Sequence, residues 1–89
     1  MKVIDGYDKS KRPREVEVLP LSYAEVMTYD KSHIHFIDTH GKLRQAKVNG
    51  KLKRWKREPE RFELPLKYGM YEYYTFTNAD LGRLVKVIE

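Results

Sequence analysis

The chain contains no cysteine among its 89 residues. Disulfide frameworks, thiolate metal sites and cysteine nucleophiles are therefore excluded, and the absence suits a reducing compartment. The chain also lacks any apolar stretch approaching the ~20 residues that cross a bilayer, and its first residues hold no apolar run long enough for a signal peptide. We therefore expect a cytoplasmic protein that does not contact a membrane.

Catalytic signatures are equally scarce. No serine lies in a G-x-S-x-G elbow, and neither a G-x-G-x-x-G fingerprint nor a P-loop occurs. His33 and His35 lie two positions apart on a predicted strand, with His40 nearby, a spacing that places two imidazoles on one side for a metal. No cysteine or convergent carboxylate cluster completes such a site. The prediction is a protein that holds no metal or cofactor and is not an enzyme.

The length supports one domain with one modest core. We predict a single small domain over residues 14–89, preceded by a flexible polar segment over residues 1–13. Lysine, glutamate and arginine are plentiful, whereas glutamine occurs once and asparagine twice. Ion-pair-rich and amide-poor composition of this kind is typical of thermophiles.

Alternation of apolar and polar residues predicts short strands over residues 14–19, 32–38, 42–48 and 62–68. A further extended run over residues 23–28 is predicted to pair with 32–38 as a hairpin. Pro65 has no N–H to donate, so an edge position or a bulge is expected there.

The Asn49-Gly50 pair is the strongest hairpin signal in the chain, because a type I′ turn needs positive φ at both central residues. Residues 42–48 and 51–55 are therefore predicted to be antiparallel neighbours. A later strand over residues 70–76 would turn Met70, Tyr74 and Phe76 inward, leaving Tyr71 and Tyr73 outward.

Thr77 and Asp80 have the spacing of an acidic capping box, which predicts one helical turn before a last strand at 85–88. In strand order over residues 15–89 the chain resembles the SH3-like small barrels, including Tudor- and KOW-type modules, in which a 3-10 turn also precedes the last strand. The predicted fold is mainly β: a small SH3-like β-barrel of five to seven short antiparallel strands. Such a fold hosts nucleic-acid, methyl-mark and peptide binding alike.

The positive charge is concentrated in one segment. The whole chain carries +5, but residues 42–61 hold nine basic and two acidic residues, a net +7. Five of the seven residues from Lys51 to Arg57 are basic, with the only tryptophan among them. Like charges facing each other across a hairpin are destabilising, and a polyanion would relieve that cost.

The aromatic side chains admit two interpretations. Exposed Tyr71 and Tyr73 would stack bases, although tyrosine is also simply a good strand former whose hydroxyl reaches water. For Trp55, alternation places the indole on the outside if Leu52 is in the core. Either Trp55 is an exposed stacking platform, or a bulge near Arg54 turns it inward.

We interpret the chain first as a non-enzymatic nucleic-acid-binding small barrel with largely sequence-independent phosphate contacts. The predicted nucleic-acid-binding residues are Lys42, Arg44, Lys47, Lys51, Lys53, Arg54, Trp55, Lys56, Arg57, Arg61, Tyr71 and Tyr73. The alternative is a protein-interaction or structural module that docks through its Tyr-rich face or sheet edge on a protein partner or on itself. DNA or RNA, and monomer or homodimer, remain open at this point.

Overall fold

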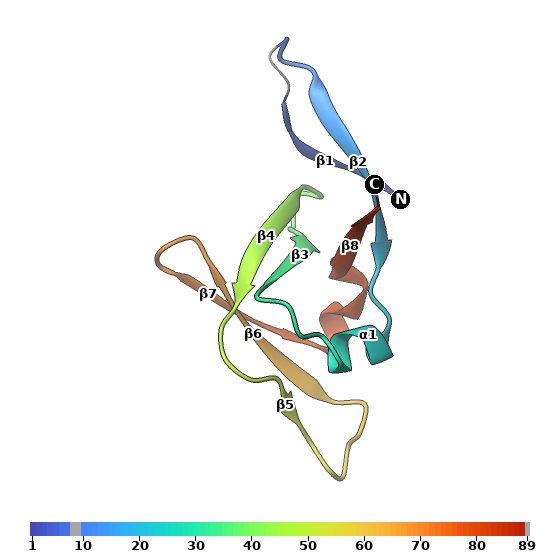
Figure 1. Ribbon diagram of the computed structural model, residues 1–89, viewed down its shortest axis with the longest axis vertical. Coiled ribbons are helices and arrows are strands. Elements are labelled where there is room, and N and C mark those ends of the chain that lie inside the picture. The colour runs from blue at the N-terminus through green and yellow to red at the C-terminus, as the bar shows by residue number, and fades with distance from the viewer. Residues whose placement is uncertain (8–9, 89) are drawn as a thin grey trace.

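A computed structural model describes residues 1–7 and 10–88 and shows a mainly β protein (Figure 1). Within this part of the chain the strands are β1 (Lys2–Tyr7), β2 (Pro13–Pro20), β3 (His33–Ile37), β4 (Leu43–Val48), β5 (Lys53–Arg54), β6 (Phe62–Tyr68), β7 (Glu72–Thr77) and β8 (Leu84–Ile88). Two helices complete the fold, α1 (Tyr23–Met27) and the 3-10 helix η1 (Asn78–Arg83). The strands form one antiparallel sheet in the order β1-β2-β8-β3-β4-β6-β5, and β7 pairs with β6.

The sheet is open, so the prediction of a closed small barrel is wrong. The described residues form eight strands rather than five to seven, and β7 pairs with β6 alone. β7 is followed directly by η1, and η1 is followed by β8. In the sheet, β8 lies between β2 and β3. One isolated bridge between Ile4 and Lys42 brings β1 against the start of β4 without forming a ladder. The mainly β class and the 3-10 turn before the last strand are confirmed.

Two apolar clusters lie on opposite faces of the sheet. The main core contains ten buried side chains from α1, β3, β4, β6, β7, β8 and the segment before α1, with Ile34, Phe62 and Leu66 fully buried among them. A minor core of Val3, Val18, Leu43 and Val85 lies where β1 and β2 cover the other face. We call the face of β3, β4, β6 and β7 that is turned away from the main core the outer face.

The N-terminal residues contribute a strand. Residues 2–7 form β1 and pair with β2, so that Val3 enters the minor core. The β1–β2 hairpin extends from one end of the molecule, and β5 lies at the other end (Figure 1). The expected mobility of residues 1–13 stays a prediction, and it includes residues 8–9, which lie outside the described residues.

Residues 23–27 form α1, so the extended run predicted there is wrong. Ser22 caps the helix: its hydroxyl accepts from the Glu25 N–H, and the Glu25 carboxylate accepts from the Ser22 N–H. Val26 buries one side of the helix in the main core. The S-x-x-E capping box was the signal for a helix here, and β3 pairs with β4 and β8 instead of with this segment.

The hairpin predicted at Asn49-Gly50 is also wrong. Both β4 and β5 pair with β6, on the edge that β7 leaves open. Gly50 has φ +105°, whereas Asn49 does not have positive φ, so a type I′ turn is absent. The chain instead bulges opposite Pro65, whose missing N–H interrupts the pairing and whose carbonyl accepts from the Asn49 N–H at 2.9 Å.

The turn before β8 forms as the sequence predicts. Thr77 caps η1, its hydroxyl accepting from the Ala79 N–H while the Asp80 carboxylate accepts from the Thr77 N–H. Arg83 stacks over the Phe76 ring at 4.9 Å and donates to the Ile37 carbonyl, which ties η1 to β7 and β3. In the described part of the chain, no helix has the length and apolar character needed to cross a membrane.

The bulge predicts different responses at its two residues. Replacing Gly50 by Ala costs about 1–2 kcal/mol of unfolding free energy, because an L-residue is strained at this φ. Crowding contributes little, since the nearest atom to an added Cβ is Pro65 Cγ at 3.9 Å. Asn49→Ala stays within about 0.5 kcal/mol. Urea unfolding of both variants measures these losses of unfolding free energy. Equal losses at the two positions would contradict the bulge and support the predicted hairpin.

Candidate nucleic-acid interface

The segment from residue 49 to 61 joins β4 to β6 and carries most of the excess charge; we call it the basic loop. It contains β5, which pairs with β6, and its Asn49 N–H donates to the Pro65 carbonyl. Further contacts hold its middle and its end. Leu52 packs against the main core, the Tyr23 hydroxyl donates to the Pro59 carbonyl, and the Arg61 N–H donates to the Glu58 carbonyl at 2.9 Å. The loop is therefore anchored at its apolar and turn residues, which leaves its cations on the surface.

Trp55 is half-buried and belongs to neither apolar cluster. Its ring is covered by the Arg61 guanidinium, whose central carbon lies 4.3 Å from the ring centroid. Arg61 also donates from Nη1 to the Glu58 carboxylate at 3.1 Å. Trp55 is therefore neither the fully exposed platform nor a core residue of the two alternatives: the indole is half-buried and already stacks on a cation of the same loop.

The other cations of the basic loop make no ion pair in the described part of the chain, although Lys53 lies opposite Glu63 where β5 pairs with β6. Lys51, Lys53, Arg54, Lys56 and Arg57 are exposed and make no ion pair within the described part of the chain. Because they are unpaired and solvated, they contribute little to folding and remain available to a polyanion.

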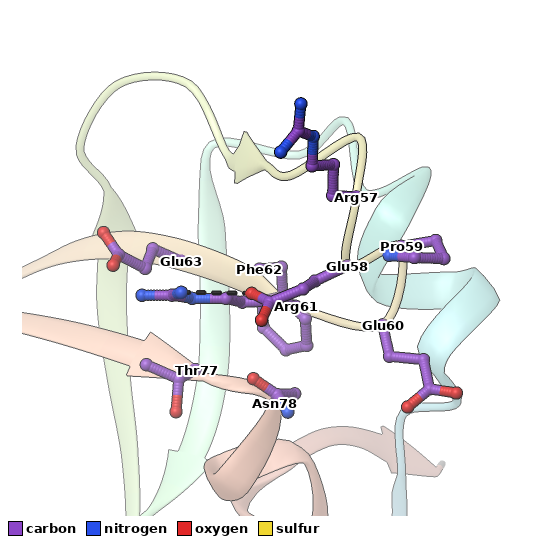
Figure 2. A pocket seen from close by; sticks show the side chains of 9 residues that line it. All are labelled: Arg57, Glu58, Pro59, Glu60, Arg61, Phe62, Glu63, Thr77 and Asn78. Atoms are coloured by element: carbon purple, nitrogen blue, oxygen red, sulfur yellow. Dashed lines mark hydrogen bonds and ion pairs between the residues drawn. The ribbon is translucent and has the colours of Figure 1, made fainter.

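A pocket of about 610 Å³ lies beside the basic loop, between it and the start of η1 (Figure 2). Glu58, Glu60 and Glu63 all line it, and Figure 2 shows Arg57 pointing away from the other side chains. Arg57 and Arg61 also line it, but the carboxylates outnumber them and Glu58 already binds Arg61, so this hollow is unsuited to phosphate. The candidate anion-binding element is the outside of the loop.

Two further cations lie on the outer face, next to a histidine and a tyrosine. His33, Lys47, Lys67 and Tyr73 are direct neighbours across β3, β4, β6 and β7, and we call them the basic row. Lys47 stands directly opposite Lys67, and the Lys67 ammonium lies 5.8 Å from the centroid of the Tyr73 ring. Two like charges in register are unfavourable, so this row favours an anionic ligand.

The surface at the basic row is hollowed. A groove of about 370 Å³ is lined by His33, Gln45, Lys47, Lys67 and Gly69. His33 and His35 do share the outer face, as their spacing predicts, but their register partners are Lys47 and Gln45. No cluster of three or more His, Asp or Glu side chains that suits a metal ion occurs among the described residues.

The β6–β7 hairpin places exposed rings next to the row. Tyr73 is 62 % exposed and Tyr71, in the turn, is 85 % exposed, in agreement with the outward direction predicted for both. Met70 was predicted to point inward and is 75 % exposed, because it lies in the turn that Gly69 opens with φ +70°. Tyr74 packs on Phe36, and Phe76 is buried.

Two of the predicted binding residues lie apart from the others. The Arg44 side chain lies on the main-core side of β4, where its Nε donates to Asp38 at 2.9 Å. Lys42 precedes β4 and bridges to Ile4 of β1. Asp38 also accepts from the backbone N–H groups of His40 and Lys42. Arg44 and Asp38 therefore stabilise the turn between β3 and β4.

The remaining predicted residues form two groups at opposite ends of β6. Lys53 pairs in register with Glu63 at the start of the strand, and Lys47 with Lys67 near its end. Four residues of strand place the groups about 13 Å apart. Lys67 and His33 are not among the residues predicted from the sequence, because the strand pairing that brings residues 33, 47, 67 and 73 into one row leaves no local signal.

Comparisons with protein-family models, with curated proteins and with solved structures found no match for this chain. Its class therefore rests on its own residues: a mainly β protein with an open antiparallel sheet, an exposed basic loop and a basic, aromatic outer face.

The Asp38 corner predicts an acid-sensitive stability. Burial by itself raises the pKa of Asp38, but the Lys42 N–H, the Arg44 guanidinium and the His40 N–H outweigh it, so the pKa lies below its ordinary value. A carboxyl with a lowered folded pKa contributes stability above about pH 4, and this is lost as the pH falls through the folded value. We expect the acid loss of unfolding free energy to be smaller in Asp38→Asn, measured by urea unfolding. Identical pH profiles would contradict this.

Proposed function

We propose that this protein binds nucleic acid without catalysing a reaction, and that its phosphate contacts come from the basic row and the basic loop. The observation that carries the proposal is the register of Lys47 opposite Lys67, beside His33 and Tyr73. Such a pair weakens the sheet by roughly 0.2–1 kcal/mol compared with a neutral pair. A phosphate bridging the two ammonium groups turns that repulsion into attraction.

The exposed rings favour single-stranded nucleic acid. Tyr71 and Tyr73 are both exposed on the β6–β7 hairpin, and Lys67 of the row lies 5.8 Å from the Tyr73 ring centroid. Each base stacked on such a ring contributes about 1–3 kcal/mol. Stacking requires unpaired bases, and every base has a face to stack, so binding tolerates many sequences. A single strand following β6 would reach both the row and the loop, which are about 13 Å apart.

The architecture is consistent with this proposal. β8, β3, β4, β6 and β7 follow one another across the sheet, and η1 precedes β8. This order supports a relation to the SH3-like modules in an opened form, a class of fold that includes nucleic-acid binders. Binding by cations and rings alone needs no metal or cofactor.

A salt titration with oligonucleotides tests the proposal. Trp55 is the only tryptophan and lies in the basic loop, so its fluorescence reports binding without a label. We expect single strands to bind more tightly than duplexes, with log K falling against log salt at a slope of about −3 to −4, as for about five phosphate contacts. Absence of binding at low salt, or an affinity indifferent to salt, would contradict the proposal.

Lys47→Glu separates binding from folding. It replaces a like-charge pair with an attractive one, so unfolding free energy rises by about 0.5 kcal/mol. Affinity for a single strand falls about tenfold or more, with a shallower salt slope.

The matched control is Arg14→Glu, which changes net charge equally on β2, in the hairpin at the far end from β5. Arg14 is exposed, and its loss leaves affinity within about twofold once salt screens long-range attraction. Equal losses from both variants would show that overall charge, and not the basic row, determines binding.

A further inference from the structure

The outer edge of β7 has unpaired backbone groups. The Thr77 N–H donates to Asp80 at 3.0 Å, so it points away from β6. Pro65, opposite Thr75, turns its carbonyl to Asn49 on the other edge of β6, so Thr75 also directs its groups away from β6. Because these directions alternate along a strand, Tyr73 and Thr75 both present an N–H and a C=O to the open edge.

This edge lacks the usual protection against strand addition. Residues 73–77 read YYTFT, without charge, proline or glycine, in a chain of which 35% of residues are charged. β1, at the other border of the sheet, carries Lys2 and Asp5, and its register with β2 shifts between Ile4 and Tyr7. Charges and bulges of that kind discourage edge pairing, and β7 has neither in this run.

A groove follows the same edge. It encloses about 400 Å³ and is lined by Tyr74, Thr75 and Phe76 on one side and by the turn at Asp38 and Thr39 on the other. Phe36, Asp80 and Arg83 complete the lining. A strand added to β7 would cover this groove and the 38 % exposed Tyr74.

We propose that β7 pairs antiparallel with β7 of a second copy of this chain, around a two-fold axis that passes between the two Tyr74 residues. In this register Tyr73 faces Thr75 of the second copy, and the two such pairs exchange four backbone hydrogen bonds. A register shifted toward the C-terminal end of β7 would need the Thr77 N–H as a donor to the second copy. That N–H already donates to the Asp80 carboxylate. The register centred on Tyr74 therefore satisfies the open edge best.

Charge complementarity selects the second copy as the occupant. The register places Glu72 opposite Phe76 of the second copy, and Arg83 lies over that ring at 4.9 Å. Glu72 makes no ion pair with a basic side chain of its own described chain, although its carboxylate accepts from the Tyr74 hydroxyl. Because the dimer is two-fold symmetric, Glu72 of each copy lies near Arg83 of the other copy. No two like charges face each other across the two β7 strands.

The dimer has one geometric consequence. A two-fold axis perpendicular to an antiparallel pair of strands leaves both outer faces on the same side of the joined sheet. The basic rows of the two copies then share one surface. The dimer is inferred from the open edge of β7 and the groove beside it, and it does not depend on nucleic-acid binding.

Sedimentation equilibrium of the full chain tests the dimer. Thr75→Pro removes only an N–H that faces the open edge and leaves the pairing with β6, whereas Thr75→Val keeps the N–H as the matched control. We expect a dimer for the wild type and for Thr75→Val, and a dissociation constant roughly tenfold or more higher for Thr75→Pro. A wild-type monomer at hundreds of micromolar, or a dimer indifferent to Thr75→Pro, overturns the proposal.

A single-cysteine experiment checks the register and does not rely on the proline variant folding. The chain has no cysteine, so Tyr74→Cys introduces the sole thiol, about 4.5 Å from its symmetry mate between Cα atoms. We expect it to form a disulfide dimer under mild oxidation. Tyr71→Cys is the control, because residue 71 is more exposed yet lies six residues out of register with its own copy. Cross-linking equally at both positions, or at neither, overturns the register.

Discussion

The missing N–H of Pro65 is the constraint on which the arrangement of this protein depends. β6 is the strand that buries Phe62, Leu64 and Leu66, and β7 occupies one whole edge of it. On the other edge an uninterrupted partner is impossible, because Pro65 offers only its carbonyl. The partner strand is therefore divided into β4 and β5, with the bulge at Asn49 and Gly50 between them.

This division sets where the charges lie. If β4 and β5 had formed the predicted hairpin around Asn49-Gly50, Lys47 would have been opposite Leu52 and not opposite a lysine. Because both strands pair with β6, Lys47 meets Lys67 instead, and the cations of the basic loop extend from the opposite end of the sheet. The two basic groups are thus held apart by the length of one strand. That separation favours an extended polyanion over a small anion.

Local chemistry explains which predictions were correct. The alternation over residues 14–19 and 62–68 and the capping pair of Thr77 and Asp80 act over a few residues, and all three form as predicted. The capping box of Ser22 and Glu25 is equally local, and it forms a helix where an extended run is predicted. At Asn49-Gly50 a strong local preference lost to tertiary pairing, since a long apolar strand gives more burial than a two-residue turn. The exposure of Tyr73 followed from alternation, whereas Met70 and Tyr71 are both exposed because they lie in the turn before β7. The contact of Trp55 with Arg61 depended on how the loop folds back.

By itself the sequence determined the β class, the 3-10 turn before the last strand, the concentration of charge in residues 42–61 and the outward direction of two tyrosines. Periodicity, capping and composition are local properties, so they survive any choice of strand partners. Only the tertiary structure decided the open sheet, the withdrawal of Arg44 to Asp38, and the row that joins His33, Lys47, Lys67 and Tyr73. These depend on which strand edges meet, and burial of the whole core selects that pairing.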